Sequence, residues 1–451
     1  MLSNFVAAVG ITIIAAILGI AGQVFGVGQS QGMWLMTAFM LTYASFMPIV
    51  GRISDNYGSR KVFMASIVTF AVGSLISSLF LSFPLIILGR AVQGLGAAGV
   101  LPVANAIVSR RFPKEKGKYL ALVNATYGLG MVAGINIGGI TFDALGWRWM
   151  FILTAIASGV AVLLSAIWLK DPDGDEDRVR HPVDVAGSAL FAISVAAFML
   201  LFRAIGNDAA SSAAVVIWTA VLVVALVLFI LRERSVSYPA VDLSMFRRPA
   251  YLTYNLVAFC FGIGMFVLTT MLPTFGQALV GFGVSQSVYA VDPFAAGMIV
   301  FTMASAPLIR RFGPRPVLFA GGLAFAAATL LLAIFTFGEV GFYVNTILVS
   351  IGLGLCMTPM NYIVIEAGGD RNEGSSAGMV SVMRSLGGVI GPTIAGLIMS
   401  RIDYSSLFVM DNILGAYSNV FLMAFIAVVV MTALSVIGMV MRKRPFKEAS
   451  I

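Results

Sequence analysis

The chain has 451 residues, of which 59% are hydrophobic and only 11% are charged. An ordinary soluble domain is about half apolar and about a quarter charged, so this composition excludes a water-soluble enzyme. The net charge of +8 reflects basic linkers rather than a nucleic-acid partner, and the two cysteines, Cys260 and Cys356, lie far apart in apolar stretches and indicate neither a disulfide nor a metal site.

The charged residues form short runs separated by apolar stretches of about 20 residues, the length that a helix needs to cross a hydrocarbon core roughly 30 Å thick. This pattern predicts an all-α polytopic membrane protein with fourteen transmembrane helices. The first span has no basic flank before Phe5 and continues past any plausible cleavage site, so we expect it to stay in the protein. The expected spans are 5–27, 32–50, 61–80, 84–108, 119–142, 149–169, 184–204, 213–231, 250–278, 285–309, 317–336, 342–366, 376–400 and 417–441.

Basic residues fall mainly on one side of these spans. Only Arg148, Arg203 and Arg401 lie near the linkers that follow odd-numbered spans, whereas 23 Lys and Arg residues lie in the other linkers and the C-terminal tail. Because an excess of Lys and Arg marks the cytoplasmic side, we expect both termini in the cytoplasm. The chain is expected in the plasma membrane, which is the cytoplasmic or inner membrane of the cell.

The longest polar stretch, Asp171 to Pro182, is acidic and is punctuated by Pro and Gly. It is too short for a domain and is typical of a flexible linker. The chain's one histidine, His181, lies in this linker, which favours a surface position over a proton relay or a metal ligand.

One segment repeats within the chain, since residues 51–62, after the second span, resemble residues 306–317, after the tenth. Transporters are commonly built from such repeats. If each repeat holds six helices, the seventh and eighth spans are extra helices between two bundles. The predicted parts are a six-helix bundle (1–170), an acidic loop with two extra linker helices (171–235), a second six-helix bundle (236–441) and a cytoplasmic tail (442–451).

The segment after the second span resembles the G-x-L-x-D-R-x-G-R-[RK] loop of the major facilitator superfamily and matches it at Gly51, Asp55, Gly58, Arg60 and Lys61. Glycines permit tight turns and close helix approach. Asp55 can accept hydrogen bonds from Arg60 and from amides at the start of a neighbouring helix. We therefore predict a conformational latch on the cytoplasmic side. An ordinary basic loop is the alternative, but it leaves Asp55 and the glycines unexplained.

Arg90 lies within the fourth span, in the sequence RAVQGLGAA, which resembles the R-x-x-Q-G-x-G-A-A segment of the same superfamily. A guanidinium within a span is costly and usually faces a polar cavity or a partner. The resemblance implies that Arg90 couples transport to a proton or to substrate movement. The alternative is a structural role in which Arg90 donates to backbone carbonyls.

The fifth span carries glycines at intervals of four residues, which present one small face to another helix. This region resembles the antiporter motif G-P-x-x-G-G, with Ile135 where the family has proline. The sequence WRWMF at 147–151 resembles the start of the sixth helix in the fourteen-helix drug:proton antiporter branch. The thirteenth span offers a second packing face and a kink. The residues assigned to these packing motifs are Gly130, Gly134, Gly138, Gly139, Gly391 and Pro392.

The first span lacks the aspartate that this branch usually carries there as part of its proton coupling. Coupling needs a group that burial can bring toward titration near neutrality, and carboxylates serve best. Asp292 is the one carboxylate clearly inside a predicted span, so we predict it as the main protonatable site, with Asp143 and Arg90 as further candidates. Alternatively, Asp292 caps a helix that Pro293 opens.

The spans expected to line a central cavity carry amides, a tyrosine, a second cation and methionines. Buried amides demand hydrogen-bond partners, and Arg384 lies about eight residues inside its span, where an interfacial anchor is a weaker interpretation. Flexible, polarizable Met suits loosely specified apolar ligands, although it equally fills gaps between packed helices. The cavity candidates are Gln23, Asn124, Tyr127, Met131, Asn255, Met357, Asn361 and Arg384.

The resemblance implies a secondary active transporter that exports amphipathic or cationic small molecules of the multidrug type by alternating access, in antiport with protons. No catalytic residue, cofactor or metal is expected. The expected partners are a small-molecule substrate, the proton gradient and the lipid bilayer, without nucleic acid and with the chain as a monomer. One alternative is a lipid or metabolite exporter with weak or no proton coupling, favoured by the scarcity of carboxylates. Another is a non-transporting membrane sensor or assembly partner, although no linker is long enough for a soluble signalling domain.

Overall fold

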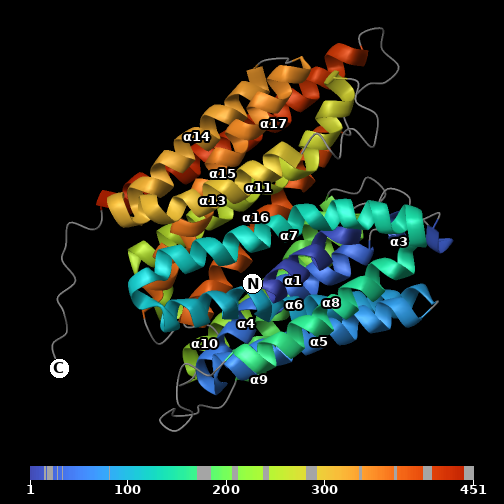
Figure 1. The fold of residues 1–451 in the computed structure, drawn as a ribbon, viewed down its shortest axis with the longest axis vertical. Coiled ribbons are helices and arrows are strands. Elements are labelled where there is room, and N and C mark those ends of the chain that lie inside the picture. Colours follow the sequence, from blue (N-terminus) through green and yellow to red (C-terminus); the bar gives the residue numbers. More distant parts are fainter. Residues whose placement is uncertain are drawn as a thin grey trace.

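The computed structural model of the chain describes residues 1–14, 17, 24–27, 29–32, 34–80, 82–169, 184–205, 212–236, 243–280, 292–334, 338–369, 373–399 and 409–440. Gln23, the acidic linker with His181, and the tail 442–451 lie outside the described residues. Every regular element among the described residues is helical (Figure 1).

The first half of the chain consists of α1 and α4–α8, with two short elements beside them. Its elements are α1 (Leu2–Thr12), α3 (Gln29–Gly32), α4 (Trp34–Tyr57), α5 (Ser59–Leu79), α6 (Phe83–Arg111), the 3-10 helix η2 (Pro113–Glu115), α7 (Lys116–Leu145) and α8 (Trp147–Trp168). Two linker helices follow, α9 (Val185–Ile205) and α10 (Ser212–Ser235).

The second half comprises α11 and α13–α17, preceded by one short 3-10 helix. Its elements are η4 (Leu243–Arg247), α11 (Pro249–Val280), α13 (Asp292–Phe312), α14 (Pro314–Ile334), α15 (Glu339–Gly368), α16 (Glu373–Met399) and α17 (Val409–Val440). Within the described residues, 13 helices are long and apolar enough to cross a membrane, and α1 is a further, shorter apolar helix. The predicted fold class is confirmed.

The side chains are distributed as in a protein whose solvent is lipid. Large apolar residues on α8 and α10, such as Ile167, Trp168 and Val216, are exposed. Many buried hydroxyls donate to a carbonyl of their own helix, as where Thr12 donates to the carbonyl of Ala8. This is the arrangement that a bilayer requires, because lipid offers no hydrogen bonds to polar groups.

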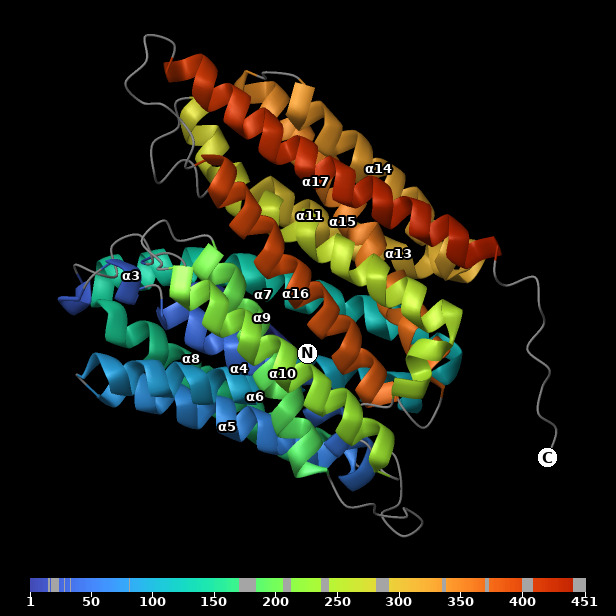
Figure 2. The same cartoon turned by 180° about the vertical axis from the view of Figure 1, so that it is seen from behind.

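The two halves meet along a limited set of helices. Helix α4 contacts α16, α6 contacts α16, and α7 contacts α13 and α15. The linker helices α9 and α10 pack on each other, and α9 lies against both α4 and α16. In both views the halves lie closer together at the end where α16 begins than at the end that carries α3 (Figures 1 and 2). The two halves therefore approach each other most closely at the end where α16 begins.

The segment expected as a loop between the second and third spans is mostly helical. Helix α4 continues through Gly51 and Asp55 to Tyr57, and α5 begins at Ser59. Gly58 alone separates them, with a φ of 100° that favours glycine. The two glycines of the motif therefore have different functions, since Gly58 makes the turn while Gly51 lies inside a helix.

Candidate functional site

Asp55 lies at the end of α4 and joins the two halves. Its side chain is only 2% exposed. It accepts hydrogen bonds from the backbone amides of Gly374 (3.0 Å) and Ser375 (2.9 Å), which open α16 of the second half. It also accepts from Nη2 of Arg110 at the end of α6 (2.5 Å). The exposed amides and the dipole at a helix start favour an anion at this position.

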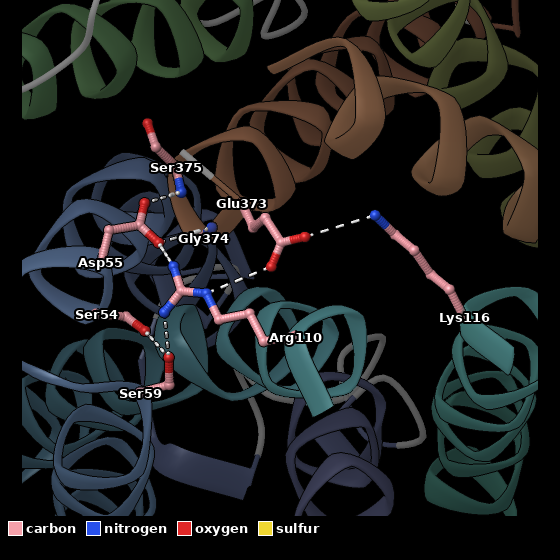
Figure 3. Close-up of polar contacts among 8 residues, drawn as sticks. All are labelled: Ser54, Asp55, Ser59, Arg110, Lys116, Glu373, Gly374 and Ser375. Carbon is pink, nitrogen blue, oxygen red and sulfur yellow. Dashed lines mark hydrogen bonds and ion pairs between the residues drawn. The ribbon is translucent and has the colours of Figure 1, made fainter. Parts of the chain in front are cut away.

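A second carboxylate extends this network. Glu373, the first residue of α16, pairs with Nε of Arg110 at 3.3 Å and with Nζ of Lys116, at the start of α7, at 3.5 Å. Arg110 also donates to the hydroxyl of Ser59. Figure 3 shows Asp55 from α4, Ser59 from α5 and Glu373 from α16 around Arg110 of α6, with Lys116 of α7 reaching Glu373 from the other side. We call the set formed by Asp55, Arg110, Lys116, Glu373 and the amides of Gly374 and Ser375 the latch.

The latch uses a different cation from the one that the sequence motif suggested. Arg60 donates to the backbone carbonyl of Ala166 on α8 (3.2 Å), and Lys61 is exposed at the start of α5. The Gly58 turn places Arg60 on α5, which packs against α8, whereas Arg110 ends a helix that packs against α4 and α16. Arg110 therefore takes the position beside Asp55 that we expected for Arg60.

Glycines bring the backbones of α4 and α16 together beside the latch. A Cβ atom on Gly51 would overlap the backbone carbonyl of Gly374. A Cβ on Gly378, one turn further along α16, would lie 2.6 Å from the carbonyl oxygen of Met47 and 2.7 Å from Cα of Pro48. Only glycine permits this approach. The two halves are therefore joined by close packing of their backbones as well as by the ion pairs of the latch.

Arg90 is completely buried and binds backbone carbonyls. Its Nε donates to the carbonyl of Leu35 and its Nη1 to that of Gly10, both at 2.9 Å, and Nη1 also donates to Oε1 of Gln93. The guanidinium lies 4.4 Å from the centre of the Phe39 ring. These bonds tie α1, α4 and α6 together, which favours the structural alternative for Arg90 over a role in coupling.

The glycines of the packing motifs face neighbouring helices, with one exception. Gly130 and Gly134 lie against backbone atoms of α1, Gly138 lies against the backbone of Ile13 directly after it, and a Cβ on Gly391 would lie 2.8 Å from the carbonyl of Ile263 on α11. A Cβ on Gly139 would meet nothing within 4 Å. Pro392 lies inside α16. The fifth predicted span therefore packs through its four-residue repeat and not through the adjacent glycine.

A buried polar cluster lies between the halves, away from the latch. The hydroxyls of Tyr43 on α4 and Tyr127 on α7 are 3.1 Å apart, and the guanidinium of Arg384 on α16 lies 6.0 Å from the centre of the Tyr127 ring. One turn from Tyr127, Asn124 accepts a hydrogen bond from Nδ2 of Asn361 on α15 (3.1 Å). We call these five residues the central cluster.

The remaining cavity candidates lie at varied positions. Asn255 donates from Nδ2 to the carbonyl of Tyr251 in its own helix (2.9 Å). Met357 is buried one turn before Asn361, and Met131 is half-buried one turn after Tyr127. The two methionines thus lie next to the central cluster along α15 and α7.

The two proton-coupling carboxylates lie at helix ends. Asp292 is the first residue of α13, is half-buried, and accepts a hydrogen bond from Nδ2 of Asn136 on α7 (3.1 Å). This contact also joins the two halves, at a distance from the latch, because α7 begins at the latch and runs away from it. Asp143 is exposed near the end of α7. Among the described residues, no group of three or more His, Cys, Asp or Glu side chains is placed to hold a metal ion.

Sequence reasoning did not identify Arg110, Lys116, Glu373 or Tyr43. The first two belong to a run of basic residues that the excess of positive charge on one side already explained. Glu373 is more than 250 residues away from Arg110 and Lys116 along the chain, and a single sequence gives no signal for such a pairing.

Comparisons with known proteins agree with this architecture. The family model of the Major Facilitator Superfamily matches residues 1–392 and, in a second match, residues 282–449. The chain is 28% identical over 377 residues to the multidrug transporter protein MdtP of Bacillus subtilis, covering 83% of this chain and 69% of the relative. It is also 28% identical to the multidrug resistance protein Stp of Mycobacterium tuberculosis, covering 83% and 70%. The crystal structure of the human organic anion transporter MFSD10 (TETRAN) shares the fold, with a TM-score of 0.66 at 16% identity, over 95% of this chain and 97% of that one.

Proposed function

Because the chain belongs to the Major Facilitator Superfamily and is a multi-pass membrane transporter rather than an enzyme, we propose that it exports amphipathic small molecules by alternating access, as a monomer. The observation that carries this proposal is the latch, in which Asp55 of one half accepts hydrogen bonds from the opening amides of α16 in the other. Ion pairs and hydrogen bonds between two halves can break and reform without unfolding either half. A contact of this kind is what rocking of two bundles requires.

In this proposal the latch closes one end of the substrate's route between the two halves, and the central cluster is the substrate-binding site along that route. In this proposal the latch end faces the cytoplasm of the cell, with both termini on that side, because the Lys and Arg residues of the linkers gather there. Opening the latch admits substrate from the cytoplasm, and closing it exposes the central cluster to the outside. The chain then acts in the plasma membrane.

The substrate class rests on the relatives and on the residues around the central cluster. Relatives at about the same identity carry multidrug names. Met131 and Met357 offer flexible apolar contacts that accommodate varied shapes. We therefore propose multidrug-type export of amphipathic molecules. The sequence also suggested cationic molecules, but none of the described carboxylates lies within 4.0 Å of the Arg384 guanidinium in this cluster.

Expression in a host that lacks its own efflux pumps tests the function. Cells that make the protein are expected to retain several-fold less of at least one amphipathic dye than cells with an empty vector, and to survive higher concentrations of related drugs. Dye retention is measured by fluorescence after energising the cells. Equal retention of every dye in a panel of differing charge, with the protein present in the membrane, contradicts the proposal.

We further propose that export is antiport with protons and that Asp292 is the protonatable group. Its contact with Asn136 joins the halves at a point remote from the latch, so protonation there changes a contact between the halves. In proteoliposomes, Asp292→Asn is expected to abolish the response of transport to an imposed pH gradient. Asp143→Asn removes the exposed carboxylate of α7 and serves as the comparison. A full pH-gradient response in the Asp292 variant rules out this assignment.

A second candidate function is export of a lipid or metabolite with weak or no proton coupling. It is favoured because none of the described carboxylates lies within 4.0 Å of the Arg384 guanidinium in the central cluster. Proteoliposomes containing both an amphipathic dye and a fluorescent phospholipid separate the two. Transfer of the dye under a pH gradient supports the leading proposal, whereas transfer of the lipid alone, without dependence on the gradient, supports the second.

A further inference from the structure

Arg384 is a buried cation whose charge no described residue neutralises. The residue is 3% exposed, and its Nη1 atom is buried and has no hydrogen-bond partner. No carboxylate of the described residues lies within 4.0 Å of its guanidinium. Arg90 also has one buried guanidinium nitrogen without a partner, Nη2, but its Nε and Nη1 donate three hydrogen bonds, and Arg110 pairs with two carboxylates. A buried guanidinium without such partners is costly and marks a functional position.

The groups around Arg384 are mainly hydrogen-bond donors or hydroxyls. From the first half of the chain, the ring of Tyr127 lies with its centre 6.0 Å from the guanidinium, and the Tyr127 hydroxyl is 3.1 Å from that of Tyr43. On the same face of α7, Nδ2 of Asn124 is buried and has no hydrogen-bond partner. Helix α16 brings Arg384 from the second half. Both halves therefore contribute to a site that offers one positive charge and several N–H and O–H groups.

We infer that the central cluster binds the anionic group of an amphipathic substrate, such as a carboxylate, sulfonate or phosphate, with Arg384 as the specificity-determining residue. This inference rests on the proposed function and names the charge of its substrate. A planar guanidinium donates two parallel hydrogen bonds to a carboxylate or phosphate. The tyrosine hydroxyls and the amide of the cluster donate further hydrogen bonds to the same anionic group. The methionines next to the cluster then contact the apolar part of the molecule.

An anionic substrate also fits the small number of carboxylates in the spans. A cell interior that is electrically negative favours the outward movement of an anion. Export of an anion therefore needs less coupling to protons than export of a cation does. Helix α1 has no acidic residue, and no described carboxylate lies within 4.0 Å of the Arg384 guanidinium. Both observations are consistent with an anionic substrate.

Two xanthene dyes of opposite charge test the inference in proteoliposomes. Carboxyfluorescein is the anionic probe and rhodamine 6G is the cationic one, and a fluorescently labelled phosphatidylglycerol tests whether the anion belongs to a lipid. We expect Arg384→Gln to lower transport of the anionic probe at least tenfold and not to lower transport of rhodamine 6G, because loss of a positive charge disfavours an anion but not a cation. Arg384→Lys keeps the charge and should retain part of the anion transport. Arg148→Gln removes an exposed arginine and is the matched control.

The outcomes separate this inference from the proposed function. Loss of carboxyfluorescein transport alone assigns the anion to a free organic molecule, and loss of labelled phosphatidylglycerol transport alone assigns it to a lipid. Equal loss of both dyes in Arg384→Gln, or unchanged transport of both carboxyfluorescein and the labelled lipid, overturns the inference while leaving the proposed export intact. No flux of any probe through the unmodified, monodisperse protein overturns the proposed function and the inference with it. Thermal unfolding of each variant shows whether a loss reflects folding.

Discussion

Replacing Asp55 with Asn is expected to reduce transport at least tenfold, because it removes the charge that holds the latch together. The carboxylate accepts from two backbone amides of α16 and from Arg110, and its side chain is almost fully buried. Asn offers one acceptor oxygen and turns an NH2 group toward these donors. Hydrogen bonds to a charged group contribute about 1.5–3 kcal/mol each, and about 1.4 kcal/mol changes an equilibrium tenfold. The state with a closed latch therefore becomes rare, and the cycle stalls.

Spin labels report the position of the latch end directly. Tyr57 on α4 and Phe312 on α13 are exposed and belong to different halves. With Cys260 and Cys356 replaced by Ala, labels at these two positions are expected to move apart in the Asp55→Asn protein. An unchanged distance distribution together with unchanged transport contradicts the assignment of the latch.

Asp184→Asn is a matched control for this experiment. Asp184 is also 2% exposed, pairs with an arginine (Arg232, 3.2 Å) and accepts from a backbone amide (Gly187, 3.1 Å). All of these groups lie on or next to the linker helices α9 and α10. This variant is expected to lower the unfolding temperature without moving the labels apart. The comparison therefore separates the loss of a buried Asp–Arg pair in general from the loss of one that joins the two halves.

The sequence was sufficient for the fold because spans and turns are local features. Apolar stretches of the required length, and a glycine such as Gly58 that ends one helix and opens the next, can be recognised from a few neighbouring residues. Asp55 was identified in the same way, including its bonds to amides at a helix start. The cation that pairs with Asp55 was not identified from the sequence, because the motif contains Arg60. Arg110, which lies outside the motif, reaches Asp55 through the packing of α6 against α4.

The position of a residue along a span did not predict the depth or the partners of its side chain. Asp292, which we expected well inside a span, begins α13, because the described helix starts seven residues later than the predicted span at 285. Arg90 and Arg384 both lie within spans, yet only Arg90 finds backbone carbonyls. That difference depends on how closely neighbouring helices approach, which hydrophobicity does not record.

Replacing Gly378 with Ala is expected to reduce transport by roughly tenfold to a hundredfold, although it adds one methyl group. The added carbon would lie 2.6 Å from the carbonyl oxygen of Met47 and 2.7 Å from Cα of Pro48, and Cβ atoms essentially never lie within 3.0 Å of another heavy atom. Both neighbours are backbone, so α16 must move away from α4. Overpacking of this kind costs about 1–3 kcal/mol, and here the cost falls only on the state in which the halves are joined.

Gly396→Ala is the matched control, because it lies on the same helix and its Cβ would meet nothing within 4 Å. Alanine favours a helix over glycine by about 1 kcal/mol, so this variant should transport normally and unfold at a slightly higher temperature. Similar losses in both variants would point to a need for flexibility in α16 rather than for close contact with α4.

The double variant Asp55→Asn/Gly378→Ala shows whether charge and close packing act through one contact. A shift of α16 away from Met47 also lengthens the bonds from Asp55 to the amides of Gly374 and Ser375, which lie one turn away on the same helix. Residues coupled through a shared backbone shift have non-additive effects. Asp55→Asn is therefore expected to reduce transport much less in the Gly378→Ala background than in the unmodified chain. Fully multiplicative losses would mean that the carboxylate and the glycine stabilise the joined halves independently.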